Sequence, residues 1–562
     1  VLQELALANL NCRWCIVTKV INADIPLLCV LAWLFIIGLM TANRIYSITL
    51  RVLVMMGVLF YVADVAVMSQ FVVRLAISDF FTYLAQPLVI WRHLSTFSPL
   101  QLCIATMILL ASVVLAAHEP SGIISRRALG GWTVSLVGLA LINPLVFPAP
   151  TLVHDWAIRN VFMANQPTGV HRDYGRDTRE RVMKAHLADT EHPKCRMGRN
   201  RKGNIVILVV ESWSAYHSAY WSGLNDWTPK LDEIAHKSLS FMQFHSGGPN
   251  TMEGLMALFT GRDFALPLAK SYPAAPFETA WGLSSSLPRI LKSEGYHTAF
   301  LTSGNLAFTR TGEWLEDIGF DHVEGHEYIG YKGIARHHFE SVADDVLYNR
   351  VLEYIGEVGS ESALFLVVET VSSHHPFVHP YTKERSEEAV FRYIDDAAAD
   401  FIGELESRRF FQGGILVVLS DHRAMTILPQ VESRLLGRGA ASHIPAFIVS
   451  GEARGQQVDR IFHQADLMQT LLAHVSDKYC FTGPARDMLA VEDTEPRCVF
   501  HARGDRRDHL DVLCSEGSGT VKVAGDESRF VNSENLSPET QRLMLDKIAW
   551  QRINAQEAAG SP

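Results

Sequence analysis

The chain has 562 residues, a mass of 62.7 kDa and 48% apolar residues, and it carries 60 Asp and Glu against 50 Lys and Arg, a formal net charge of -10. Residues 1–150 hold only thirteen of these 110 charged side chains. This composition excludes intrinsic disorder, a collagen or repeat protein and a wholly soluble enzyme, and the negative charge argues against binding nucleic acid through a basic face. We therefore predict a membrane part, residues 1–150, followed by a soluble part.

The first 150 residues contain hydrophobic segments of bilayer length, about 20 residues each. The predicted spans are residues 25–42, 48–70, 100–117 and 129–147, with an interfacial or re-entrant piece within 71–98 and a fifth, N-terminal span as an open alternative. Arg44 and Arg51 lie at the first connection, and Arg126 and Arg127 lie between the last two spans. Basic residues mark cytoplasmic loops, so we expect a multi-pass inner-membrane anchor with everything beyond residue 147 outside the cytoplasm. No cleavable signal peptide is evident.

Residues 151–202 are polar and mixed in charge, which predicts a linker with a surface helix. Four cysteines, Cys195, Cys480, Cys498 and Cys514, would face an oxidising exterior. They permit two disulfides, and the sequence leaves all three pairings open.

The soluble part begins with IVILVV after Asn204, a continuous β-branched run typical of a strand buried on both faces. Similar runs alternate with amphipathic helical stretches, and this alternation predicts an α/β domain with a mainly parallel sheet and helices on both faces. The further strands are expected at 297–301, 363–368, 414–419 and 445–449, and the helices at 229–240, 285–294, 344–356, 388–406 and 464–474. We place the catalytic domain at 203–500 and a C-terminal extension at 501–562, with edge strands within 500–531 and a covering helix at 538–553.

Polar residues follow three of these strands. Glu211 follows the first, Ser373 and His374 follow the third, and Asp421 with His422 follows the fourth. Ligands bind at the carboxyl ends of parallel strands, and carboxylates with an imidazole suit a divalent cation. An Asp-His pair also occurs often in a capped loop that binds no metal. The residues after any one strand are therefore weak evidence for a metal site.

Thr251 is the candidate nucleophile. It follows the turn Ser246-Gly-Gly-Pro-Asn250 and precedes a stretch with helical periodicity, which places it at a helix N-terminus. Backbone N–H groups there favour an alkoxide or a phosphate, and a nearby cation would lower the hydroxyl pKa. The alternative is that Thr251 only caps the helix.

The order of these motifs resembles the alkaline-phosphatase/sulfatase superfamily, in particular its lipoteichoic acid synthase-like, phosphoglycerol transferase branch. The resemblance is carried by Glu211, Thr251, Ser303-Gly-Asn305, Ser373-His-His-Pro-Phe377 and Ser420-Asp-His422, and it is closest over residues 203–475. It implies that Glu211, Thr251, Asp421 and His422 hold one divalent metal ion, with Mn²⁺ preferred and Zn²⁺ or Mg²⁺ as alternatives.

The resemblance also implies roles for other residues. Thr251 would accept the phosphoryl group, and His374 matches the family's substrate-site histidine. We further expect His374 to transfer protons, a role that a near-neutral pKa permits; the alternative is that His374 or His375 only packs against Pro376. The implied substrate-binding residues are Arg310, Asn305, Ser303 and His375. This chain departs from the family at Ser303, which stands in place of a histidine, in the shortened loop before Arg310, and at Arg423, which replaces a glycine.

The predicted function is a membrane-anchored transferase that moves a phosphoglycerol-type head group from a phospholipid to an extracytoplasmic glycan or lipid acceptor through a phospho-Thr251 intermediate. A phosphoethanolamine transferase, a phosphodiesterase and a non-catalytic binding protein are the alternatives. Sulfate-ester hydrolysis is disfavoured, because Thr251-Met-Glu-Gly-Leu lacks the Cys/Ser-x-Pro-x-Arg pattern that formylglycine formation needs.

Overall fold

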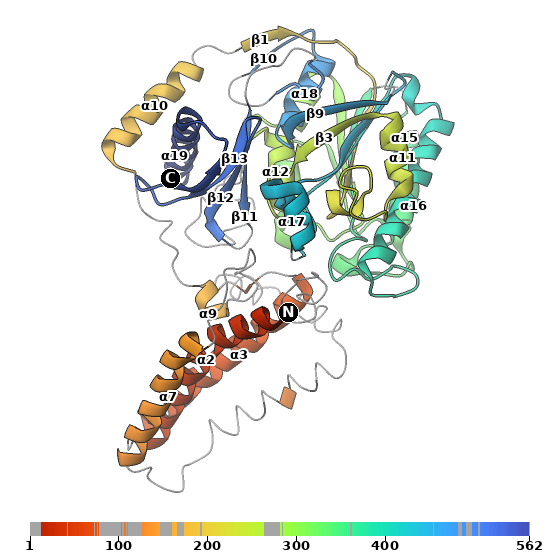
Figure 1. Cartoon of the computed structure of the whole chain (residues 1–562). Helices are drawn as coiled ribbons and strands as arrows, with labels where there is room; N and C mark the ends of the chain where they lie inside the picture. Colours follow the sequence, from red (N-terminus) through yellow and green to blue (C-terminus); the bar gives the residue numbers. More distant parts are fainter. Residues whose placement is uncertain are drawn as a thin grey trace. The chain divides into compact units, whose positions relative to one another are not determined.

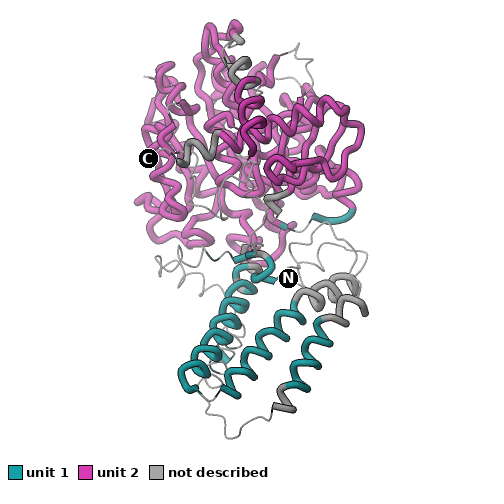
Figure 2. Tube along the Cα trace, turned by 90° about the vertical axis from the view of Figure 1, so that its left-hand side faces the viewer, with its two compact units in different colours: residues 1–167, 271–273, 426–430 teal, residues 168–270, 274–425, 431–562 magenta. Residues whose placement is uncertain are grey.

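The computed structural model of the protein describes most of the chain beyond its first twelve residues. The described residues are 13–41, 43–71, 126–146, 160–165, 174–190, 194–262 and 281–560, apart from short internal gaps, together with single positions between 74 and 110. These residues divide into two compact units, shown in different colours in Figure 2. Each unit is described by itself.

Helices form the first unit. Its long helices are α2 (Arg13–Met40), α3 (Arg44–Phe71) and α7 (Arg126–Val146), and a short helix, α9 (Val161–Ala164), follows. The helix α2 packs against both α3 and α7 (Figure 1). These three helices coincide with three of the predicted spans, whereas span 100–117 and the piece within 71–98 lie largely outside the described residues.

Among the described helices, the segment Arg44–Val65 is long and apolar enough to cross a membrane. The apolar parts of the other two long helices, Asp24–Met40 and Gly130–Ala140, are shorter. The described part of the chain thus contains one candidate span, and the multi-pass anchor stays a prediction.

An eight-stranded sheet forms the centre of the second unit (Figure 1). Its order is β5-β4-β6-β2-β7-β8-β3-β9, and every neighbouring pair is parallel except those that include β8. The predicted, mainly parallel sheet is therefore confirmed. The strands are β2 (Ile205–Val210), β3 (Leu239–His245), β4 (Tyr296–Thr302), β5 (His322–Glu324), β6 (Ala363–Glu369), β7 (Ile415–Ser420), β8 (Ala446–Val449) and β9 (Gln456–His463).

Both faces of this sheet are covered, as the continuous apolar run of β2 predicts. Ile205, Ile207 and Val209 belong to one hydrophobic core, and the alternate residues of β2 belong to the other. The first core is completed by helices α12 (Thr251–Thr260), α13 (Leu287–Ser293), α14 (Thr311–Asp317) and α18 (Asp466–Val475). The second core is completed by α11 (Pro229–Lys237), α15 (Asp344–Val358) and α16 (Glu387–Ser407).

The prediction missed three strands of the sheet, β3, β5 and β9. The helix expected at 229–240 ends at Lys237, and β3 begins two residues later. The edge strands β5 and β9 were not predicted, because their side chains are only partly buried and lack a continuous apolar run.

Two disulfides connect the polar segments. The linker contains α10 (Arg176–Thr190) and β1 (Lys194–Met197), which pairs with β10 (Lys478–Phe481). Cys195 and Cys480 are bonded across this pair, and Cys498 is bonded to Cys514. The structure thus selects one of the three pairings that the sequence left open.

The chain ends in a second sheet, an antiparallel meander of four strands. Its strands are β11 (Cys498–Arg503), β12 (Arg506–Cys514), β13 (Gly517–Lys522) and β14 (Arg529–Glu534). The helix α19 (Pro538–Gly560) packs Met544 and Ile548 into the core of this sheet, as expected for a covering helix. The sheet begins at Cys498, three residues before the predicted start of the extension.

Four buried histidines lie close together where the two sheets of this unit approach each other. His245 and His463 are register partners at the ends of β3 and β9, and the rings of His245 and His443 are 5.5 Å apart. Burial lowers the pKa of His245 well below its usual value, and His443, His463 and His501 lower it further. Burial likewise lowers the pKa of His443 to about 4. The side chains of His245 and His443 are therefore neutral in the folded protein at pH 7.

We expect the His443→Asn variant to lose less stability in acid than the wild type. His443 takes up a proton in the unfolded chain below its ordinary pKa of 6.5, but in the folded chain only below about 4. The wild type should therefore lose up to about 1.4 kcal/mol per pH unit relative to the variant as the pH falls through this window. Urea unfolding of the detergent-solubilised protein at several pH values measures the difference. The exposed His236→Asn variant is the control, and an equal pH slope for all three proteins would contradict the expectation.

Candidate active site

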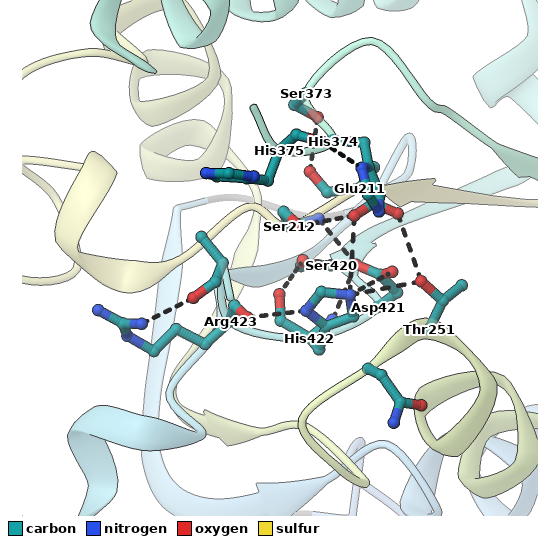
Figure 3. Close-up of polar contacts among 12 residues, drawn as sticks. Glu211, Ser212, Thr251, Ser373, His374, His375, Ser420, Asp421, His422 and Arg423 are labelled. Carbon is teal, nitrogen blue, oxygen red and sulfur yellow. Dashed lines mark hydrogen bonds and ion pairs between the residues drawn. The ribbon is translucent and has the colours of Figure 1, made fainter. Parts of the chain in front are cut away.

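Three of the predicted residues meet at one edge of the central sheet. Glu211 follows β2 directly, and Asp421 and His422 follow β7, the neighbouring parallel strand. One ligand atom from each of the three lies within 4.8 Å of the others, and all three side chains are buried. Figure 3 shows these side chains pointing toward one another and toward Thr251. The strand-exit argument therefore placed them correctly.

Thr251 brings a hydroxyl group to this cluster. Its Oγ1 lies 3.4 Å from Oε2 of Glu211 and 3.3 Å from Nε2 of His422. Thr251 is the first residue of α12, and Asn250 is the residue that caps the helix, because its Oδ1 accepts from the backbone N–H of Glu253 at 3.0 Å. The capping role is thus filled by Asn250, and the Thr251 hydroxyl faces the cluster.

Close packing fixes α12 against the end of β7. A Cβ atom built on Gly254 would lie 2.3 Å from the carbonyl oxygen of Asp421, so only glycine permits this approach. The side chain of Gln464 joins the two elements: its Oε1 accepts from the N–H of Gly247 at 2.6 Å, and its Nε2 donates to the carbonyls of Ser420 and Asp421 at 2.8 and 2.7 Å. Gln464 could not be predicted from the sequence, because its side chain hydrogen-bonds backbone atoms of distant segments.

The hydrogen bonds around the cluster leave its inner atoms available for a cation. Nδ1 of His422 donates to the carbonyl of Arg423 at 2.7 Å, which leaves a lone pair on Nε2. Oδ1 of Asp421 accepts from the N–H groups of Ser212 and His422, both at 2.8 Å. Its other oxygen, Oδ2, is buried without a hydrogen-bond partner and lies 3.2 Å from Nε2 of His422.

The carboxylates of the site are buried close to one another. Burial raises the pKa of Glu211 well above its usual value, and the nearby Asp421 raises it further. The same two causes raise the pKa of Glu369, the last residue of β6, to about 8. A divalent cation would remove this repulsion, and two carboxylates, an imidazole and a hydroxyl are donors that Mn²⁺ and Zn²⁺ accept. The residues present therefore fit a metal ion.

His374 lies in the loop that follows β6. The hydroxyl of Ser373 donates to the carbonyl of Glu211 at 2.6 Å, which ties this exit to the cluster. Nδ1 of His374 hydrogen-bonds the carbonyl of His375 at 2.6 Å. Burial lowers the pKa of His374 to about 3, with a further contribution from His338. The expected near-neutral pKa is therefore wrong for the protein without substrate, because the ring is buried and His338 further disfavours its charged form.

Three of the predicted substrate-binding residues make contacts with other parts of the domain. The hydroxyl of the buried Ser303 donates to the carbonyl of Val342 at 3.1 Å. Asn305 donates to Glu340 through its side chain, at 2.5 Å. The exposed Arg310 pairs with Glu313, and its guanidinium lies 4.8 Å from the ring centre of Trp281. None of the contacts described for these residues reaches Thr251.

Two residues beside the cluster point away from it. The ring of His375 is buried and packs edge-on against Phe377, and in Figure 3 it extends away from Thr251. Arg423 forms a bidentate ion pair with the buried Glu432, with N···O distances of 2.9 and 2.8 Å, and its guanidinium lies over the ring of Tyr216. Arg423 therefore stabilises the loop after His422 and does not face the Thr251 hydroxyl.

Comparison with known proteins gives the family of this domain. The family described as sulfatase matches residues 203–477. Two solved structures share the fold: a protein in the alkaline phosphatase superfamily from Vibrio parahaemolyticus, with TM-score 0.56, 22% identity and coverage of 69% of this chain and 98% of that one, and the lipoteichoic acid synthase LtaP from Listeria monocytogenes, with TM-score 0.50, 18% identity and coverage of 67% and 97%.

Curated relatives carry the name phosphoglycerol transferase I. The protein from Xanthomonas campestris pv. campestris (strain B100) is 24% identical over 340 residues, which are 55% of this chain and 46% of that protein. The protein from Escherichia fergusonii is 30% identical over 257 residues, 40% of this chain and 32% of that protein. The chain thus spans at most about half the length of these relatives. The family match and the shared fold together identify residues 203–477 as a sulfatase-like domain.

Proposed function

We propose that this protein transfers a phosphoglycerol head group from a phospholipid to a hydroxyl group of a glycan or lipid acceptor. The observation that carries the proposal is the position of the Thr251 hydroxyl, at a helix N-terminus and within 3.4 Å of both Glu211 and His422. The relatives named phosphoglycerol transferase I support the choice of head group. A threonine in place of the formylglycine precursor also argues against sulfate-ester chemistry.

Glu211, Thr251, Asp421 and His422 would hold one divalent metal ion, for which we propose Mn²⁺. A bound divalent ion lowers the pKa of a coordinated hydroxyl and neutralises charge on a phosphate. The buried, unpartnered Oδ2 of Asp421 and the raised pKa of Glu211 support this ligand set.

The proposed reaction has two displacements at phosphorus. The Thr251 oxygen first attacks the phosphodiester, its proton leaves, and the bond to the diacylglycerol oxygen breaks, so that diacylglycerol departs with a proton. The hydroxyl of the acceptor then attacks the phosphorus of phosphoglyceryl-Thr251 and loses its proton. The bond to the Thr251 oxygen breaks and the threonine regains a proton. The N-terminus of α12 favours the negative charge of both phosphodiesters.

His374 is the proposed proton carrier for these displacements. Its Nδ1 is bonded to a backbone carbonyl, so the ring would accept a proton at Nε2. The ring is neutral without substrate, and a phosphate group bound beside it would raise its pKa, since an adjacent negative charge favours the imidazolium.

The disulfides support the proposed location. Cys195–Cys480 and Cys498–Cys514 need an oxidising compartment, such as the periplasm. We therefore propose that the catalytic domain lies on the periplasmic side of the inner membrane, anchored by the N-terminal helices. The donor lipid and the membrane would then be the partners on one side, and a glycan or lipid acceptor the partner on the other.

We expect the His374→Ala variant to transfer the head group about 10²-fold more slowly than the wild type, the lower end of general acid–base contributions. The assay uses membranes that supply donor and acceptor, and it measures labelled acceptor against free glycerol phosphate. The matched control is His375→Ala, whose ring points away from Thr251. Wild-type product that is almost entirely free glycerol phosphate would favour a phosphodiesterase and contradict the transferase proposal.

A further inference from the structure

Ser212 hydrogen-bonds both carboxylates of the candidate site. Its hydroxyl donates to Oε1 of the adjacent Glu211 at 2.6 Å, and its backbone N–H donates to Oδ1 of Asp421 at 2.8 Å. Both bonds are drawn in Figure 3. Glu211 follows β2 and Asp421 follows β7, so a single residue connects carboxylates that come from two neighbouring strands.

These bonds occupy one oxygen of each carboxylate. Oδ1 of Asp421 also accepts from the N–H of His422, whereas Oδ2 has no hydrogen-bond partner among the described residues. On Glu211, Oε1 is bonded to Ser212 and lies 3.7 Å from Nε2 of His422, beyond hydrogen-bond distance, while Oε2 lies 3.4 Å from Oγ1 of Thr251. The bonds from Ser212 thus restrict the rotation of both carboxylates and leave the second oxygen of each for a cation.

The backbone of Ser212 is held in an unfavourable conformation. Its φ angle is 58°, in the left-handed region that residues other than glycine seldom adopt. Such residues persist only where surrounding contacts impose the conformation, and they gather at functional sites. Here the preceding peptide is fixed by Thr370 and Ser373, which hydrogen-bond the N–H and the carbonyl of Glu211, and the following Trp213 is fully buried in the core.

Ser214 connects this loop to the loop that follows β7. Its buried hydroxyl donates to the carbonyl of Ser212 at 3.1 Å and accepts from the N–H of Ala424 at 2.8 Å. Ala424 stands two residues after His422. The backbone of Ser212 is therefore held by contacts that do not involve its own hydroxyl, so a variant without this hydroxyl should keep the loop in place.

We propose that Ser212 is a positioning residue for the divalent ion, holding the carboxylates of Glu211 and Asp421 so that one oxygen of each is available as a ligand. The proposal rests on the proposed function, in which these two residues bind the metal, and Ser212 itself is not a ligand. Groups that hydrogen-bond a ligand orient it before the ion arrives, and their loss typically costs about 10- to 100-fold in metal affinity. Without the hydroxyl, the Glu211 carboxylate can turn, and part of the binding free energy is used to order it.

The test measures Mn²⁺ binding by the detergent-solubilised full chain, with neither donor nor acceptor present. Electron paramagnetic resonance reports the Mn²⁺ that remains free, so Kd is obtained without an activity assay. Ser212→Gly removes the hydroxyl, keeps the N–H that reaches Asp421 and suits a positive φ. We expect its Kd for Mn²⁺ to rise about 10- to 100-fold, and Ser212→Ala should show a similar rise.

Ser240→Ala is the matched control. Ser240 is a buried serine of β3 whose hydroxyl donates to the carbonyl of Ala235 at 2.7 Å, so its loss removes a buried hydrogen bond without touching the described contacts of Glu211 or Asp421. This variant should bind Mn²⁺ as the wild type does. At saturating Mn²⁺, transfer by Ser212→Gly should return toward the wild-type rate, because the variant loses affinity for the ion and keeps Thr251.

Each outcome supports or overturns the assignment. Equal Kd values for the wild type and both Ser212 variants overturn it and leave the proposed function intact. An equal rise in Ser240→Ala also overturns it, since the weaker binding would then follow from general destabilisation. A wild type that binds no Mn²⁺ overturns the proposed ion and the role of Ser212 together. The expected Kd values in a protein that transfers no glycerol head group would support Ser212 and reject the proposed function.

Discussion

Replacing Thr251 by valine should lower transfer by at least about 10³-fold without unfolding the domain, because the loss of a nucleophile removes the covalent route. Valine keeps the shape of threonine and removes only the hydroxyl that faces Glu211 and His422. The helix keeps its cap, since Asn250 supplies it. Turnover of head-group-labelled lipid in membranes measures the effect.

Thr251→Ser is the matched control for this variant. Serine retains a hydroxyl at the same position, so activity within about 10-fold of the wild type is expected. The urea unfolding midpoint should be similar for all three proteins. Transfer by Thr251→Val at the wild-type rate would exclude Thr251 as the covalent acceptor.

Removal of divalent ions should inactivate the protein, and adding Mn²⁺ back should restore it. Without a cation, Glu211 and Asp421 repel each other in a buried site, and the pKa of Glu211 is raised. Asp421→Asn should lower transfer by at least about 10²-fold, because it removes one charge from the proposed ligand set. The assay is repeated over a series of Mn²⁺, Zn²⁺ and Mg²⁺ concentrations.

A second readout of the metal does not depend on activity. An ion that binds the folded state should raise the thermal unfolding midpoint of the wild type with increasing concentration, and this rise should shrink in Asp421→Asn. Glu233→Gln, which changes an exposed carboxylate on α11, is the control and should respond as the wild type does. Full activity after chelation, with no ion-dependent change in the midpoint, would contradict the metal site.

The sequence predicts the parts of this fold that local pattern determines. The run IVILVV is typical of a strand buried on both faces, and β2 lies at the centre of the sheet with all six residues buried. The strand β3 was missed because its residues, LSFMQFH, alternate irregularly between buried and exposed positions. Its place in the sheet is decided by pairing with β8 and β9, which are more than 200 residues away.

The candidate site likewise contains residues that the sequence predicts and residues that it does not. Glu211, Asp421 and His422 could be placed because strand exits share one edge of a parallel sheet. The low pKa of His374 could not be anticipated, since it follows from burial of the ring in the folded protein and from His338, which is distant in the sequence. Ser212 also carried no signal: its hydroxyl donates to the adjacent Glu211, but its N–H reaches Asp421 only because the two strands are neighbours.

The central claim is that Thr251 carries the head group during transfer. Mass spectrometry of the Thr251-containing peptide, after the full-length protein is incubated with a glycerol-head-group phospholipid and no acceptor, tests it most directly. We expect the mass of one phosphoglycerol group on Thr251, lost again when the acceptor is added, and no such group in the Thr251→Val protein. An unmodified peptide from a preparation that transfers the head group, or a modification on another residue, would contradict the claim.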